Sequence, residues 1–308
     1  MTQITATLVR DLRNQTGAGM MDCKKALNET NGSIEDAVDW LRKKGLASAQ
    51  KKTGRVAREG LVALHLSPLR GDIIEVNAET DFVARNELFQ DYVHQVAALA
   101  ANCDGNIENV SQQIMPSTKK TAGDTLNDLV AKIGENMTLR RSAFLSVDEG
   151  VVTGYIHNQK TPTSGQIGVL VALRSAGDKA ALQKLAKNIA MHVAAARPQF
   201  LNTDDVDEKT LERERQILIE QAKNSGKPEN IIEKMVEGRL RKFYEEVVLN
   251  NQIFVIDGER KISKLIADEA KNINAEIKIT GFIRFELGDG IEKREQNFAE
   301  EVQAVVQA

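Results

Sequence analysis

The first 45 residues carry three short amphipathic patterns separated by breaks. Each pattern repeats apolar residues at the three- and four-residue spacing of a helix that faces a core. The inward positions are Leu8, Val9, Leu12, Met21, Ala26, Leu27, Ala37, Val38 and Leu41. The breaks fall at GAG, residues 17–19, and at Asn31-Gly32. The pattern predicts a small three-helix unit. Its core is so small that it would be only marginally stable alone, which suits a module attached to a larger domain.

Polar residues predict where these helices begin and end. Thr5 and Ser33 stand where a hydroxyl can cap the first and third helices. Asp36 follows Ser33 at the position of a capping-box acid. Gly45 suits a C-terminal cap, so the third helix is predicted to end there.

A basic segment follows at 42–58, where seven lysines and arginines occur without an acidic residue. One interpretation is a contact with RNA or with an acidic protein surface. The other is a solvated linker, which the absence of interleaved aromatic residues favours because bases need a stacking surface.

One pattern then occurs twice, about ninety residues apart. Strand-like segments begin at Glu59-Gly60-Leu61-Val62 and at Glu149-Gly150-Val151-Val152, and a second apolar strand follows at 71–76 and at 165–171. An amphipathic helix comes next in both copies. Its apolar faces are Phe89, Val93, Val96 and Ala100 in the first copy, and Leu182, Leu185, Ile189 and Val193 in the second. A hairpin followed by a helix, twice, predicts two similar α+β subdomains with antiparallel sheets. The hairpin loop at 158–165 is expected to be longer than its first counterpart, and the polar stretch 102–128 predicts an irregular or helical connection.

Residues 204–249 are charged and helical throughout, with one break at 224–228. Their few apolar residues, such as Leu218 and Leu240, suit either the seam of a projecting antiparallel coiled coil or an ordinary pair of surface helices. Strand patterns return at 253–256 and 277–285, and a last helix is predicted over about 292–306.

Candidate chemistry is sparse. The sequence holds no glycine-rich phosphate loop, and the four histidines show no HxxxH or HExxH spacing for a metal. We therefore expect no cofactor, no bound metal and no direct nucleotide binding. A binding protein is favoured over an enzyme, although catalytic residues can also come together only in the folded chain.

Charge and cysteine content narrow the setting. The net charge of −3 argues against bulk electrostatic binding to nucleic acid or to anionic membranes. The N-terminus lacks the apolar stretch of a secretory signal, and the apolar run 169–173 is too short to span a bilayer. Two cysteines make neither a disulfide framework nor a CxxC pair. We expect a cytoplasmic protein.

The stretch AETDFVARNELF, residues 78–89, places Phe82 just before a helix-start signal. The residues alone leave two hypotheses for Phe82. It packs as a staple on the helix it precedes, or it stands exposed as an anchor for a partner.

Six stretches, in this order, together resemble bacterial elongation factor Ts over nearly the whole chain. They are TGAGMMDCKKAL at 16–27, VNAETDFVARN at 76–86, KIGENMTLRR at 132–141, IAMHVAAARP at 189–198, SGKPENIIEKMVEGR at 225–239 and GFIRFELGDGIEK at 281–293. The chain departs from the family at Ala78, where members often carry cysteine, and we expect that difference to affect packing only.

The resemblance implies a multi-domain α+β architecture. Its parts would be an N-terminal three-helix ubiquitin-associated-like domain, a core of two related antiparallel-sheet-plus-helix subdomains, an inserted antiparallel coiled coil and a C-terminal helical module. The implied ranges are 1–54 for the N-terminal domain and basic linker, 55–146 for the core N-subdomain, 147–203 and 250–288 for the two parts of the core C-subdomain, 204–249 for the coiled coil and 289–308 for the C-terminal module.

The resemblance also implies a function. Members are guanine-nucleotide exchange factors that bind elongation factor Tu, disturb its magnesium and phosphate site and promote GDP release, without catalytic chemistry of their own. The partner-binding residues by this match are Thr80, Asp81, Phe82 and Val83. The alternative is an adaptor that binds RNA or ubiquitin-like proteins through the N-terminal module.

Overall fold

The computed structural model describes residues 4–16, 18–223 and 229–292. At the N-terminus, helices α1 (Ala6–Thr16), α2 (Met20–Glu29) and α3 (Ile34–Lys52) pack together. Their shared core consists of Val9, Leu12, Cys23, Ala26, Leu27 and Ala37. Both predicted caps are confirmed, because Thr5 Oγ1 accepts from the Leu8 amide at 3.2 Å and Ser33 Oγ accepts from the Asp36 amide at 3.3 Å.

Two predictions for this unit are wrong. Met21 is 77% exposed, because it lies two residues before the buried Cys23 and so on the opposite face of α2. Helix α3 does not end at Gly45 but continues to Lys52, so most of the predicted linker 42–58 is helical. A β-carbon at Gly45 would lie only 3.0 Å from that of Ala131 in helix α6. Gly45 therefore allows α3 and α6 to pack closely and does not cap the end of a helix.

The centre of the molecule is an antiparallel six-stranded sheet. Its strands are β1 (Glu59–Ser67), β2 (Arg70–Ala78), β3 (Met137–Ser146), β4 (Gly150–Thr161), β5 (Ser164–Arg174) and β6 (Lys278–Glu286). The order is β3-β2-β1-β5-β4, and β6 pairs with β5. Both predicted hairpins are confirmed. Strand β1 pairs with β5 at Val62–Gly165 and Ala63–Ser164, and the Leu64 amide donates to the Thr163 carbonyl oxygen at 2.9 Å. This short seam links two three-stranded halves.

The two halves pack face to face across this seam. The shared apolar layer contains Val62, Leu64, Ile73, Ile156, Leu170 and Phe285. Glycines allow the close approach, since a β-carbon at Gly168 would lie 2.6 Å from Val62 Cγ1 and one at Gly71 would lie 2.8 Å from Leu170 Cδ2. The interior is therefore filled by side chains from both halves.

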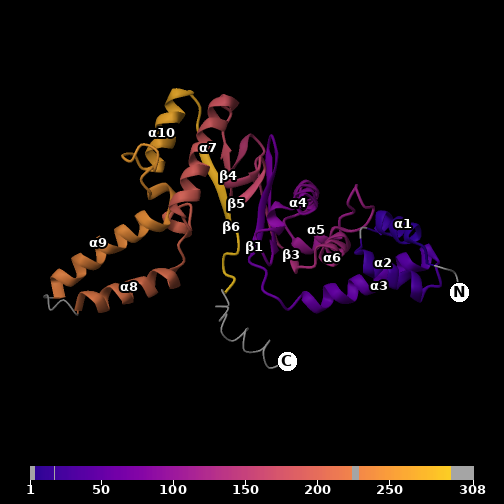
Figure 1. Cartoon of the computed structure of the whole chain (residues 1–308). Helices are drawn as coiled ribbons and strands as arrows, with labels where there is room; N and C mark the ends of the chain where they lie inside the picture. The colour runs from indigo at the N-terminus through magenta and orange to yellow at the C-terminus, as the bar shows by residue number, and fades with distance from the viewer. Residues whose placement is uncertain (1–3, 17, 224–228, 293–308) are drawn as a thin grey trace.

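Helices cover the outer face of each half, as Figure 1 shows. On β1–β3 lie α4 (Glu87–Ala100), α5 (Ile107–Gln112) and α6 (Ala122–Ile133), and on β4–β6 lie α7 (Lys179–Ala196) and α10 (Ile262–Asn272). The predicted apolar faces of α4 and α7 are buried at every position named from the sequence. Asp178 Oδ1 caps α7 by accepting from the Ala181 amide at 2.8 Å.

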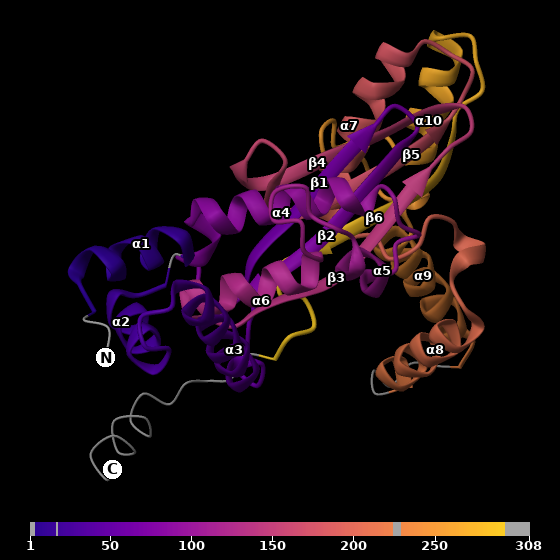
Figure 2. The ribbon, with the colours of Figure 1, turned by 90° about the vertical axis from the view of Figure 1, so that its right-hand side faces the viewer.

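Helices α8 (Glu208–Lys223) and α9 (Glu229–Val247) form the predicted helical hairpin and extend away from the sheet (Figures 1 and 2). Leu218, Val236 and Leu240 form the small apolar cluster between them. Short 3-10 helices are η1 (Val83–Arg85), η2 (Thr203–Asp205) and η3 (Leu249–Asn251). The predicted break at 224–228 lies outside the described residues. So does the predicted last helix, apart from its first residue.

Two further predictions are corrected. Segment 253–256 is not a strand, because Ile253 makes one isolated bridge to Lys261 and the chain then turns into α10. Asp257 favours that turn, since its Oδ1 accepts from the Glu259 amide at 3.0 Å and the Arg260 amide at 3.1 Å. The hairpin loop predicted at 158–165 is only Pro162-Thr163, because strands β4 and β5 continue almost to the tip.

Candidate functional site

The predicted partner-binding residues lie together in the short connection between strand β2 and helix α4. Phe82 is 74% exposed, and Asp81 beside it is about half exposed. Val83, by contrast, is only 2% exposed and belongs to the apolar core of the β1–β3 half. The connection therefore buries one member of the predicted set and presents Phe82 to solvent.

Local sequence explains this orientation. Val83 and Ala84 enter the core through the 3-10 helix η1, and Asn86 Oδ1 then caps α4 by accepting from the Leu88 amide at 3.0 Å. Phe89, in the first turn of α4, is fully buried, so the apolar contact at the start of this helix is made by Phe89 and not by Phe82. The exposure of Phe82 contradicts the staple hypothesis.

The start of the connection is held by the segment after α6. The Glu135 carboxylate accepts from the Thr80 amide at 3.0 Å and from Thr80 Oγ1 at 2.9 Å. Glu79 Oε1 accepts from the Asn136 amide at 2.5 Å and lies 3.6 Å from Arg55 Nη1. Carboxylates accepting several hydrogen bonds fix geometry more firmly than neutral acceptors.

These supporting residues were not singled out in the sequence. Glu135 and Asn136 belong to the KIGENMTLRR stretch, one of the six that carry the family resemblance. Their place in that stretch was the sequence feature that could have marked them as functional. The contact itself joins residues 55 positions apart, which no local pattern reveals.

The end of the connection carries one ion pair. Arg85 Nη2 lies 2.8 Å from Asp81 Oδ2, and both side chains are more than half exposed. Such a pair contributes little to stability in water. Asp81 thus keeps its carboxylate accessible to a partner.

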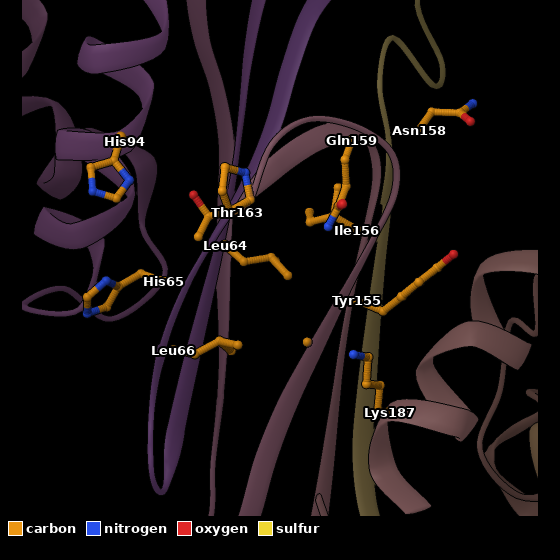
Figure 3. Close-up of a pocket in the computed structure, with 12 residues that line it drawn as sticks. Leu64, His65, Leu66, His94, Tyr155, Ile156, Asn158, Gln159, Thr163 and Lys187 are labelled. Atoms are coloured by element: carbon orange, nitrogen blue, oxygen red, sulfur yellow. The ribbon is translucent and has the colours of Figure 1, made fainter. Parts of the chain in front are cut away.

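A cavity of about 670 Å³ lies away from the Phe82 connection, between α4 and α7 (Figure 3). His65 and His94 line it on one side, and Lys187 extends toward it from α7 on the other.

Within the described residues, no three side chains of the histidine, cysteine, aspartate and glutamate types gather as metal ligands. Both cysteines are buried and free. None of the helices in the described ranges has the length and apolar character needed to cross a membrane.

An exposed aromatic side chain on an anchored connection is typical of a surface that contacts a macromolecule. Comparison with known proteins identifies the family. The family described as "Elongation factor TS" matches residues 79–289. Elongation factor Ts of Rhodospirillum centenum is 58% identical over 302 residues, covering 98% of each chain. Elongation factor Ts of Rhodospirillum rubrum is 58% identical over 305 residues, covering 99% of each. That of Bartonella quintana is 54% identical over 301 residues, covering 98% of each.

The chain belongs to the elongation factor Ts family. It is accordingly a nucleotide exchange factor of translation elongation that acts on elongation factor Tu and has no catalytic chemistry of its own.

Proposed function

We propose that this chain binds elongation factor Tu in both its GDP-bound and nucleotide-free forms, and that Phe82 inserts beside the partner's magnesium and phosphate site. Thr80, Asp81 and Val83 would complete the contact region, with Val83 acting from the core by fixing the connection. The observation that carries this proposal is the 74% exposure of Phe82 on a connection anchored at both ends. Such an anchor is typical of interface residues that dominate binding.

The energetics suit an exchange factor. Because coupling between two ligands is reciprocal, a factor that weakens GDP binding is itself weakened by GDP. Burying one aromatic side chain contributes about 1.5–3 kcal/mol. If only the distorted state of the partner offers an apolar gap for Phe82, that free energy favours the distorted state. Displaced magnesium then leaves the phosphates without their main neutralising charge.

The remaining parts would serve this complex. We infer an N-terminal ubiquitin-associated-like domain and its connection at 1–54, a core N-subdomain at 55–146, and a core C-subdomain at 147–203 and 250–288. The α8–α9 pair at 204–249 would be an antiparallel coiled coil, and 289–308 a C-terminal helical module. The chain would act in the cytoplasm and would bind no nucleotide, nucleic acid or membrane itself.

The test is release of fluorescent GDP from elongation factor Tu in a stopped-flow instrument. Phe82→Ala should slow release at saturating factor severely, because truncation of an interface anchor costs about 2 kcal/mol or more. Leu69→Ala is a matched control, since Leu69 is also exposed but lies at the opposite end of β2. Unchanged release by Phe82→Ala would refute the proposed role of Phe82.

A further inference from the structure

The carboxylate of Glu135 joins two distant parts of the first half. It accepts from both the amide and the hydroxyl of Thr80, at 3.0 Å and 2.9 Å. The amide bond fixes the backbone at Thr80, and the hydroxyl bond fixes its side chain. Two donors from one residue therefore set both the position and the direction of the chain that leads into Phe82.

Glu135 is itself placed by the end of helix α6. Gly134 adopts a left-handed conformation with φ of 93°, and its amide donates to the Val130 carbonyl oxygen at 2.9 Å. This turn closes the helix as a glycine C-cap does. Asn136, next along, is buried, and its Nδ2 donates to the Arg55 carbonyl oxygen at 2.7 Å. The carboxylate thus projects from a fixed turn.

A second fixed point lies just beyond Phe82. Val83 and Ala84 are 2% and 4% exposed in the core. Only Asp81 and Phe82 lie between Thr80 and Val83, and the Phe82 carbonyl oxygen accepts from the Arg85 amide at 3.1 Å. A two-residue span with both ends held leaves the Cα–Cβ bond of Phe82 few directions in which to point.

We propose that Glu135 is a positioning residue for exchange, which holds Phe82 in its partner-ready orientation through Thr80. The inference rests on the proposed role of Phe82. Holding an anchor in its bound orientation before association reduces the ordering cost of binding. Glu135 acts through Thr80, and Phe82 is the exposed anchor of the connection that follows, so most of the effect of losing Glu135 should depend on Phe82.

A double-mutant cycle tests this dependence. The proteins are the wild type, Glu135→Ala, Phe82→Ala and the double variant, each measured for GDP release from elongation factor Tu well below all four melting midpoints. Glu135→Ala should slow release at saturating factor by about tenfold, equivalent to about 1.4 kcal/mol. In the Phe82→Ala background the same change should slow release much less than it does in the wild type.

The outcomes separate the two ideas. If Phe82→Ala leaves release unchanged, the proposed function itself fails. If Phe82→Ala slows release while Glu135→Ala does not, or while the two effects multiply, the positioning role fails. Strong coupling between them supports it.

Two milder variants keep the test decisive if Glu135→Ala folds poorly. Glu135→Gln retains one acceptor oxygen and should recover part of the rate. Thr80→Val removes only the hydroxyl donor and should give an intermediate loss. Asp128→Ala, which removes an ion-paired carboxylate from helix α6 just before Glu135, is the control and should leave release unchanged. Full activity in both Glu135→Gln and Thr80→Val would overturn the inference.

Discussion

The imidazole Nε2 of His192 lies 2.9 Å from the side-chain oxygen of Gln252, and both side chains are buried. On the other side of the ring, Nδ1 lies 3.2 Å from the Val255 amide, which can only donate. The ring is therefore neutral, with its proton on Nε2. Gln252 Nε2 in turn donates to the Glu246 carbonyl oxygen at 2.6 Å. One histidine on α7 thus holds the segment that leads into α10.

This arrangement predicts a pH-dependent stability. Burial lowers the pKa of His192 below its ordinary value of 6.5, and the hydrogen bond with Gln252 opposes that shift only in part. Between the lowered pKa and pH 6.5, His192 is therefore protonated in the unfolded chain but neutral in the folded chain. The free energy of unfolding should consequently fall as pH drops from 6.5 toward the lowered pKa. Melting midpoints measured between pH 7.5 and pH 5.5 should show this loss.

The control is His157, which is exposed and contacts Tyr155 at 3.1 Å. His192→Gln should flatten the acid side of the stability profile, even though its midpoint at pH 7.5 is lower. His157→Gln should leave the slope unchanged. Equal slopes in the wild type and His192→Gln would show that another group governs the acid response.

Glycines at the start of the two repeats predict a second effect. Gly60 and Gly150 adopt φ of 125° and 124°, and an added β-carbon would lie 2.2 Å and 2.1 Å from a backbone oxygen. Gly150→Ala should lower the free energy of unfolding by about 1–3 kcal/mol, because the clash is with backbone that cannot move aside. Gly238→Ala in α9 should do the opposite. Nothing lies within 4 Å of its added β-carbon, and alanine favours a helix by about 1 kcal/mol over glycine. Urea unfolding of both variants checks the pair, and equal destabilisation would contradict it.

Phe82 and Phe89 offer a third, matched pair. Phe82 is 74% exposed, whereas Phe89 is fully buried. Phe89→Ala should lower the free energy of unfolding by about 3–5 kcal/mol, but Phe82→Ala should change it by only about 0.5 kcal/mol or less. Thermal melting of both variants distinguishes them. A large loss of stability in Phe82→Ala would mean that its ring packs on the protein itself.

Sequence patterns predicted what depends on local periodicity. The apolar faces of α4 and α7 and the two hairpins are local, so residue spacing alone located them. The predicted helix end at Gly45 was wrong because a glycine that allows close packing inside a helix has the same sequence pattern as a glycine cap. Only the contact with Ala131 in the folded chain distinguishes the two. Segment 253–256 misled because three of its residues, Ile253, Val255 and Ile256, are apolar yet exposed.

The candidate site was predicted only in part, for a related reason. The stretch around Phe82 can be recognised from the sequence, but its orientation in the folded chain depends on Glu135 and Val83. Glu135 reaches Thr80 across 55 positions. That contact forms only once β2 and α6 are both in place, and local spacing therefore says nothing of it.

The N-terminal unit leads to the last prediction. Helix α3 packs on α6, and Arg55 just beyond it supplies the carbonyl oxygen that Asn136 binds. The apolar core of the first half begins only at Leu61. Removing residues 1–54 should therefore leave a folded core with the Phe82 connection intact.

That truncated chain should bind elongation factor Tu more weakly, because a second contact on the same chain raises the effective concentration of the first. At saturating concentration it should still release GDP rapidly, since Phe82 and Glu135 are retained. Titration calorimetry and stopped-flow release measure the two effects separately. Adding Phe82→Ala to the truncation is the control and should abolish the remaining acceleration. If the truncated chain bound as tightly as the full chain, residues 1–54 would not contact the partner. If it bound but failed to accelerate release even at saturation, the N-terminal unit would take part in disrupting the nucleotide site itself.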